Sequence, residues 1–189
     1  MGRGLGWQVR ALVAAGLMWA ALPLCGQKAT AVPKLDLNQL SGTWYQIARL
    51  PDKAEKKCLS DGMMLWALSD KKDSFQLGKF CKIKAGNLNS DNNFGKQEKD
   101  GSGRLKVRRL VIFSTKYWVL ATGPNFEWAL VGNPNHKALW VLARTPTLDE
   151  ATVTQVESQA TAQGFPVAKL RPVTHTQHSF KAEEMGSGQ

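Results

Sequence analysis

Short runs of apolar residues, separated by turns, fill the middle of the chain between residues 43 and 145. The runs are rich in Val, Leu, Trp and Phe and are bounded by Gly, Pro, Asn and Asp, a pattern typical of β-strands. Seven of them are clear: TWYQIARL (43–50), GMMLWALS (62–69), SFQLGKFCKIK (74–84), RLKVRRLVIF (104–113), YWVLATG (117–123), EWALVGN (127–133) and ALWVLART (138–145).

The segment AGNLNSDNNFGKQEKDGSG (85–103) differs from these runs because Gly, Asn and charged residues dominate it. We expect a loop here, with at best a short strand over residues 94–98, and a turn at DGSG (100–103). Counted with this strand, the pattern predicts eight sequential antiparallel strands.

The spacing of apolar residues changes at Thr147. TLDE (147–150) predicts a capping box in which Thr147 caps a helix and Glu150 reaches back to it, and Gly164 would end that helix. The apolar positions between them fall near helical spacing: Leu148, Ala151, Val156 and Ala160. The fold class is therefore all-β, an eight-stranded up-and-down antiparallel barrel with one C-terminal α-helix. Such a barrel closes its own edges and holds side chains or one small ligand.

The first 31 residues have the pattern of a secretory signal peptide. Arg3 and Arg10 precede an apolar run of fourteen residues, which is too short for a comfortable membrane span, and ATA (29–31) supplies small residues for cleavage. We expect the mature chain to begin at Val32; a buried N-terminal helix is the alternative. Cys25 ends the apolar run and could carry lipid in a bacterial lipoprotein, although Leu24 is bulky for such a signal.

The mature protein would thus hold one domain over residues 32–174 and a polar, flexible tail over 175–189. The whole chain has a net charge of +10, which falls to about +7 without residues 1–31. Basic density at 104–109, and in the lysines near residue 55, favours peripheral contact with an anionic membrane. An exported protein without aromatic residues between these cations is not expected to bind nucleic acid.

HTQH (175–178) could form a weak metal ligand pair or a solvated tail, and we predict no metal site and no cofactor.

Three stretches resemble the conserved stretches of the lipocalins: GTWYQIARLP (42–51), YWVLATGPNFEWALVGN (117–133) and LWVLARTP (139–146). The resemblance covers roughly residues 36–170 and is strongest to bacterial outer-membrane members and to apolipoprotein D. It implies that Gly42 and Trp44 lie at the barrel's narrow end, where Arg144 covers the indole, as structural rather than catalytic residues. Gly123 departs from the family, whose members often carry Asp there.

Cys58 and Cys81 remain once the signal is removed, and an even pair in an exported protein predicts a disulfide. The same pair matches a pattern among the bacterial lipocalins. By strand alternation, each cysteine belongs to the face that its strand turns inward.

Strand alternation, together with the strand registers that the resemblance implies, predicts which side chains line the barrel. Most are apolar or aromatic, as a hydrophobic guest requires; the alternative is that they simply fill the barrel. The predicted lining is Met64, Trp66, Phe75, Leu77, Lys79, Leu105, Val107, Arg109, Tyr117, Val119, Ala121, Ala129, Val131, Trp140 and Leu142.

Lys79 and Arg109 stand out in this lining because a cation buried alone is costly. One interpretation is that either or both bind the carboxylate or phosphate of an amphipathic lipid. The other is a one-residue bulge that turns either side chain outward.

The resemblance implies an exported protein that binds or transports a small hydrophobic ligand, a fatty acid or lysophospholipid, in the barrel. Its compartment would be the periplasm or outer membrane in a bacterium, and the extracellular space otherwise. Two alternatives remain: a lipid-modifying isomerase, which needs a free cysteine in the cup, and a protein that binds membrane surfaces through its basic charge. We predict that the protein is not an enzyme, because both mature cysteines are expected to be paired.

Overall fold

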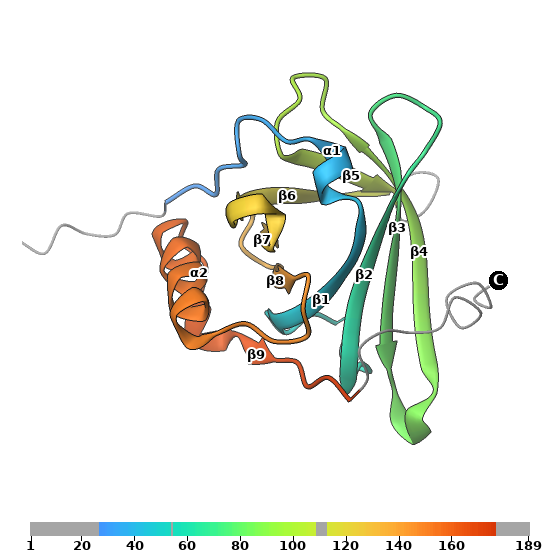
Figure 1. Cartoon of the computed structure of the whole chain (residues 1–189), viewed down its shortest axis with the longest axis vertical. Helices are drawn as coiled ribbons and strands as arrows, with labels where there is room; N and C mark the ends of the chain where they lie inside the picture. Colours follow the sequence, from blue (N-terminus) through green and yellow to red (C-terminus); the bar gives the residue numbers. More distant parts are fainter. Residues whose placement is uncertain (1–26, 54, 109–112, 177–189) are drawn as a thin grey trace, which may run out of the picture.

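The computed structural model describes residues 27–53, 55–108 and 113–176. Eight strands form one antiparallel sheet in the order β2-β3-β4-β5-β6-β7-β8-β1, and β1 also pairs with β2 to close the barrel (Figure 1). A ninth, short strand pairs with the end of β1. The strands are β1 (Gly42–Arg49), β2 (Ser60–Leu68), β3 (Ser74–Lys82), β4 (Leu88–Gln97), β5 (Arg104–Arg108), β6 (Ser114–Thr122), β7 (Trp128–Gly132), β8 (Leu139–Ala143) and β9 (Arg171–Pro172). The predicted eight-stranded up-and-down barrel is confirmed.

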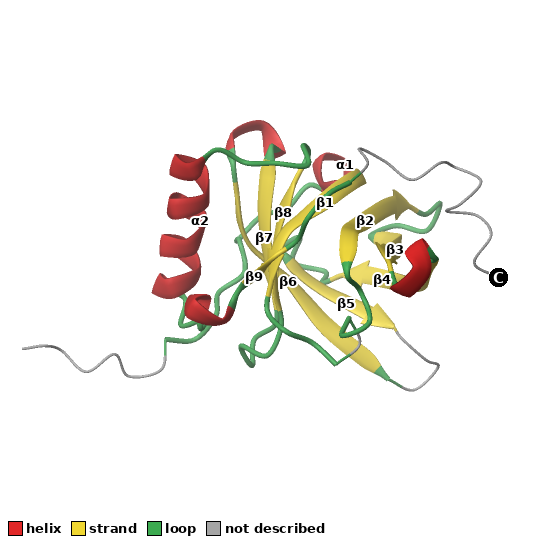
Figure 2. Ribbon diagram, turned by 90° about the horizontal axis from the view of Figure 1, so that it is seen from below, coloured by secondary structure: helices red, strands yellow, loops and turns green. Residues whose placement is uncertain are grey.

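The helices lie outside the barrel wall. The longest, α2 (Glu150–Ala162), runs beside β7 and β8, whereas α1 (Leu37–Leu40) precedes β1 (Figure 2). Three single turns of 3-10 helix complete the described chain: η1 (Lys84–Gly86), η2 (Pro124–Phe126) and η3 (Val167–Lys169). Within the described chain, no helix is long and apolar enough to cross a membrane.

The prediction of a loop before residue 94 was wrong, because β4 extends from Leu88 to Gln97. It pairs with β3 along its length, from Lys82↔Leu88 to Ser74↔Lys96. Asn and Gly have low strand propensity, but continuous pairing with a neighbouring strand outweighs that preference.

The helix α2 begins at a different cap from the one predicted. Asp149, not Thr147, is the N-cap: its carboxylate accepts hydrogen bonds from the backbone N–H (2.8 Å) and hydroxyl (2.7 Å) of Thr152. The other end is as predicted, because Gly164 takes a positive φ of 80° after the last helical residue. The N–H groups of Gly164 and Phe165 then bond the carbonyls of Thr161 and Ala160, which is the Schellman arrangement.

The barrel wall separates two apolar clusters. The inner cluster fills the barrel, and the outer cluster joins the outer face of β6, β7 and β8 to Val156 and Ala160 of α2. Ala121 was predicted to face inward but packs against the outer cluster. The reason is a break in register between Val119 and Ala121, which turns Ala121 to the outer side opposite Leu130.

The chain ends of the described region also contact the barrel. The Val32 N–H bonds the Val119 carbonyl (2.9 Å), while Ala29 is buried in the outer cluster. Residues 27–31, which we expected to leave with the signal peptide, therefore pack against the folded domain; residues 1–26, including Cys25, lie outside the described chain. His175 and Thr176, expected in the flexible tail, likewise contact the barrel, through Gln46 and Asp61. The rest of that tail, from residue 177, is not described.

Candidate functional site

The narrow end of the barrel is sealed around Trp44. The Trp44 indole is fully buried and donates its N–H to the Leu40 carbonyl (2.7 Å). The Arg144 guanidinium lies 3.7 Å from the centre of the ring, where cation–π attraction and planar stacking both act. Arg144 also donates to three backbone carbonyls, those of Thr43 (3.0 Å), Gln39 (2.7 Å) and Ser41 (2.9 Å). These bonds fix the guanidinium over the indole.

At two positions at this end of the barrel, only glycine avoids a steric conflict. Gly42 takes a φ of 96°, and a Cβ there would lie 3.2 Å from Arg144 Nη1. A Cβ at Gly123 would collide with the indole of Trp128. At the position where family members often carry Asp, Gly123 thus leaves room for the Trp128 indole to pack against the backbone.

The wall of the barrel is apolar. Twelve of the residues predicted to face inward are at most 8% exposed and share the inner cluster: Met64, Trp66, Phe75, Leu77, Leu105, Val107, Tyr117, Val119, Ala129, Val131, Trp140 and Leu142. Leu35, Leu40 and Ala138, which come from outside the strands, belong to the same cluster and were not predicted. These apolar side chains pack closely against one another inside the barrel.

Aromatic rings contact one another within this wall. Tyr117 and Trp140 lie nearly parallel, with centroids 5.0 Å apart, and Trp66 and Phe75 are 5.1 Å apart. Among the described residues, the N–H of the buried Trp66 meets no hydrogen-bond acceptor. This donor therefore faces the apolar interior unpaired.

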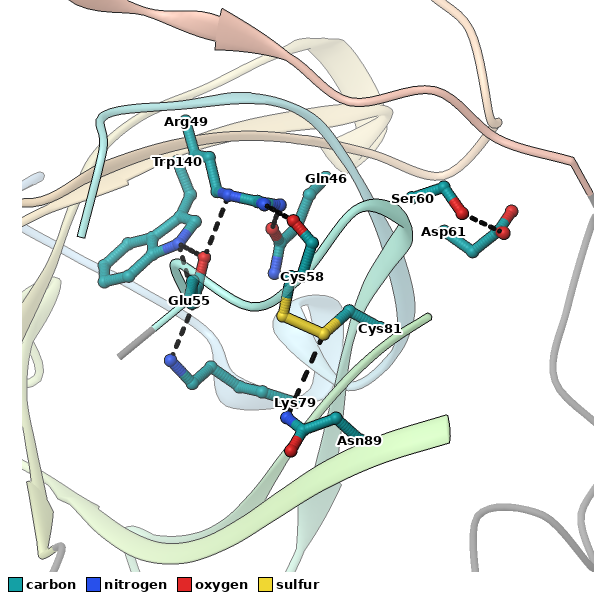
Figure 3. The surroundings of a disulfide bond; sticks show 10 residues. All are labelled: Gln46, Arg49, Glu55, Cys58, Ser60, Asp61, Lys79, Cys81, Asn89 and Trp140. Carbon is teal, nitrogen blue, oxygen red and sulfur yellow. Dashed lines mark hydrogen bonds and ion pairs between the residues drawn. A yellow bond between two sulfur atoms is a disulfide. The ribbon is translucent and has the colours of Figure 1, made fainter. Parts of the chain in front are cut away.

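A charged cluster lies near Arg49, the last residue of the strand that carries Trp44. Lys79, which is 8% exposed, donates from Nζ to Oε1 of Glu55 at 2.8 Å (Figure 3). The Trp140 N–H points at both oxygens of the same carboxylate, at 3.2 Å each, and Arg49 Nε lies 3.3 Å from Oε2. Lys79 also lies 5.4 Å from the centre of the Trp140 ring. A single buried carboxylate thus accepts hydrogen bonds from Lys79 and Trp140 and forms an ion pair with Arg49.

The position of Lys79 settles its orientation. It pairs with Met64 on one side and Asp91 on the other without a break in register, which excludes the alternative of a bulge at this residue. Arg109, the second predicted cation, lies outside the described residues.

Lys79 keeps its positive charge in this setting. Burial, the largest single influence, lowers the pKa of Lys79, whereas Tyr117, Glu55 and Asp91 raise it. Together, the three groups that raise the pKa outweigh burial, so the pKa of Lys79 lies above its ordinary value of 10.5. Burial has the opposite effect on an acid, and it raises the pKa of the Tyr117 phenol.

A disulfide joins the connection between β1 and β2 to β3, three residues after Glu55. Cys58 and Cys81 are bonded, with Cα atoms 5.5 Å apart, which confirms the predicted pair. Arg49 reinforces this link by donating to the Cys58 carbonyl and the Gln46 side chain, both at 3.0 Å.

Sequence analysis missed Glu55 and Arg49 as parts of the site. Glu55 belongs to the connection between β1 and β2, where alternation assigns no direction to a side chain. The available signal was indirect: a lysine predicted inside an apolar barrel requires an anionic partner.

A second feature lies on the outer face of the barrel. A hollow of about 600 Å³ is lined by Ser69, Lys71, Ser74, Phe75, Phe94, Gly95, Lys96, Lys106, Arg108, Phe113 and Ser114. Phe94 and Phe113 are 64% and 62% exposed, and cationic side chains surround them.

The family follows from comparison with known proteins. The model of the lipocalin-like domain matches residues 35–175. The chain belongs to the lipocalin family. This lipocalin is 32% identical to the outer membrane lipoprotein Blc of Citrobacter freundii over 171 residues, which cover 86% of this chain and 92% of that protein. It is 26% identical to temperature-induced lipocalin-1 of Arabidopsis thaliana over 152 residues, or 74% of this chain and 78% of the relative.

Solved structures share the fold of this lipocalin. The cockroach allergen Per a 4 superposes with a TM-score of 0.65 at 15% identity, covering 79% of this chain and 94% of the allergen. Insecticyanin from the tobacco hornworm, Manduca sexta, superposes with a TM-score of 0.60 at 17% identity, covering 83% of this chain and 87% of insecticyanin. Family and fold together support the binding of a small hydrophobic ligand.

Proposed function

We propose that this lipocalin binds and carries an amphipathic lipid with an acidic head, a fatty acid or a lysophospholipid, inside its barrel. One observation carries the proposal: the apolar wall from Trp66 to Trp140 ends at two cations, the buried Lys79 and the partly buried Arg49. The alkyl chain would contact the wall, and the acidic head would lie near the cations.

The lining residues supply the first test. Titration of the mature protein with oleic acid or a lysophospholipid should quench the fluorescence of Trp66 and Trp140 and saturate at one lipid per chain. Trp66→Phe and Trp140→Phe should each reduce the quenching. Trp118→Phe is the matched control, because Trp118 packs on the outer side of the wall and should leave the quenching unchanged. No saturable quenching by any lipid class overturns the proposal.

An exported location is part of the proposal. The relative from Citrobacter freundii is named an outer membrane lipoprotein, and the signal pattern of residues 1–31 agrees with export. In a bacterium, the protein would act in the periplasm or at the outer membrane, with or without lipid on Cys25. Mass spectrometry of the mature protein would identify both its first residue and any attached lipid.

The isomerase alternative has little chemical support. The disulfide consumes Cys58 and Cys81, so neither offers a thiolate nucleophile. Counting thiols in the native mature protein tests this directly: a reactive thiol would restore the alternative.

Peripheral contact with an anionic membrane is a second proposed property, and the outer hollow favours it. Phe94 and Phe113 could enter the lipid interface while Lys71, Lys96 and Arg108 approach the phosphates. Vesicles containing phosphatidylglycerol should therefore bind the protein more strongly at low salt than at high salt. The variant Phe94→Ser/Phe113→Ser should bind these vesicles more weakly, and Leu59→Ser, at another exposed apolar residue, should not. Equal binding by all three proteins would contradict membrane contact through this surface.

A further inference from the structure

The three donors around Glu55 form a site suited to any carboxylate. Lys79 comes from β3, Arg49 from the end of β1 and Trp140 from β8, so three separate strands of the wall converge on one anion. Two positive charges and an indole N–H match the acceptor oxygens of a carboxylate.

Glu55 lies in a loop, whereas its three donors lie on strands. The donors belong to barrel strands, which ladder hydrogen bonds hold on both sides, whereas Glu55 lies in the connection from β1 to β2. The backbone positions of the donors are therefore fixed independently of the carboxylate that they bind.

We propose that Glu55 is an internal substitute for the acidic head of the ligand, and that an acidic lipid binds by displacing the Glu55 carboxylate from Lys79, Arg49 and Trp140. This inference rests on the proposed function and adds the mechanism of head-group selection. It also assigns Glu55 and Arg49 a role in specificity.

Electrostatics explains why the exchange selects acids. Lys79 and Arg49 are both largely buried, and removing their anion without replacement would leave two desolvated charges unpaired. A lipid carboxylate restores the pairing that Glu55 gives up, so burial of its alkyl chain against the wall drives the exchange. A fatty alcohol cannot replace the charge and must bind with Glu55 still in place.

The geometry gives the bound lipid a direction. Trp140, which donates to Glu55, stacks on Tyr117, and Met64 lies directly across the ladder from Lys79. Trp66 is two residues further along β2 and pairs with Gly42 at the narrow end. A lipid with its head at Lys79 would therefore extend its chain past Met64 toward Trp66.

The test compares dodecanoic acid with dodecanol, two ligands that differ only in the head. In Glu55→Gln, which keeps the shape of the side chain and removes its charge, affinity for the acid should rise about tenfold, the equivalent of roughly one charge-assisted hydrogen bond. Affinity for the alcohol should change by less than about twofold, because the alcohol carries no charge to pair with the freed cations. Adding Lys79→Met to Glu55→Gln should abolish the gain for the acid.

Glu98→Gln is the matched control, since it removes the same charge from a pair with Lys106 on the outer surface and should leave both affinities unchanged. Should Glu55→Gln fail to fold, Glu55→Asp shortens the reach of the carboxylate, keeps its charge, and should also favour the acid over the alcohol. An unchanged ratio of the two affinities, with both lipids still bound, overturns this inference and leaves the proposed function intact. No binding of either lipid by wild type or variant overturns the proposed function itself.

Discussion

At the scale of single residues, the most consequential contact outside the candidate site joins Arg144 to Trp44 across a hundred residues of sequence. Arg144 stacks on the indole and donates to three backbone carbonyls at the narrow end. Arg144 therefore covers the indole and also satisfies three carbonyls. Removing its side chain would uncover the ring and leave the carbonyls without these donors.

Replacing Arg144 with Met should therefore lower the free energy of unfolding by about 2–4 kcal/mol, the sum of a cation–π contact and several hydrogen bonds. Equilibrium unfolding in urea measures the change. Arg171→Met is the control, because this arginine is exposed on β9 and should cost less than about 0.5 kcal/mol. Equal losses in the two variants would show that Arg144 does not seal the barrel.

The two buried indoles offer a second comparison. Trp44 donates its N–H to Leu40, whereas the N–H of Trp66 lacks an acceptor among the described residues. Trp66→Phe should thus cost only the lost ring area, since it also removes an unsatisfied donor. Trp44→Phe should cost about 1–2 kcal/mol more, because it strips the Leu40 carbonyl of its partner. Urea unfolding of both variants tests this order, and a larger loss for Trp66→Phe would contradict it.

At the scale of elements, one acidic residue makes several of the bonds that hold the C-terminal segment after β9. Asp61 is fully buried, with a φ of 52°, and accepts from the N–H (2.5 Å) and hydroxyl (2.6 Å) of Thr176. Its own N–H donates to the Thr174 carbonyl at 2.8 Å. These bonds attach residues 174–176 to the start of β2.

Changing Asp61 to Asn should loosen this segment while keeping a residue that tolerates positive φ. Amide hydrogen exchange in residues 171–176 should accelerate, and the free energy of unfolding should fall by about 1–3 kcal/mol through loss of charge-assisted hydrogen bonds. Asp100→Asn, at an exposed acid in the turn between β4 and β5, is the control. Unchanged exchange in residues 171–176 would argue against the attachment.

The elements also show where sequence reasoning succeeded and where it failed. Seven strands and the helix were predictable because their apolar spacing is regular, and Gly164 marked the helix end. Residues 88–93 were not, because Asn and Asp there carry no strand signal and gain their conformation from pairing with β3. Ala121 failed for another reason: a shift in register reverses alternation, and no residue type marks it.

The candidate site was predictable to a similar extent. Alternation identified the apolar wall and Lys79 because strand side chains obey a period of two. It could not identify Glu55, whose direction depends on the path of a connection between strands. The physical argument that a buried cation needs an anion was sound, and the protein itself supplies that anion.

At the scale of the whole molecule, the barrel is polarised along its axis. One end is closed by Trp44 and Arg144, the middle is apolar, and the far end gathers Lys79, Arg49 and Glu55. This order matches the two parts of an acidic lipid, an alkyl chain and a charged head. The central claim is that such a lipid binds with its head among the cations.

The most direct measurement uses a fatty acid labelled with ¹³C at its carboxyl carbon, bound to the protein in solution. Nuclear magnetic resonance should detect one bound carboxylate per chain, in contact with the indole N–H of Trp140 and not with that of Trp118. A lipid that binds with its labelled carbon in free solvent, away from Trp140, would contradict the account.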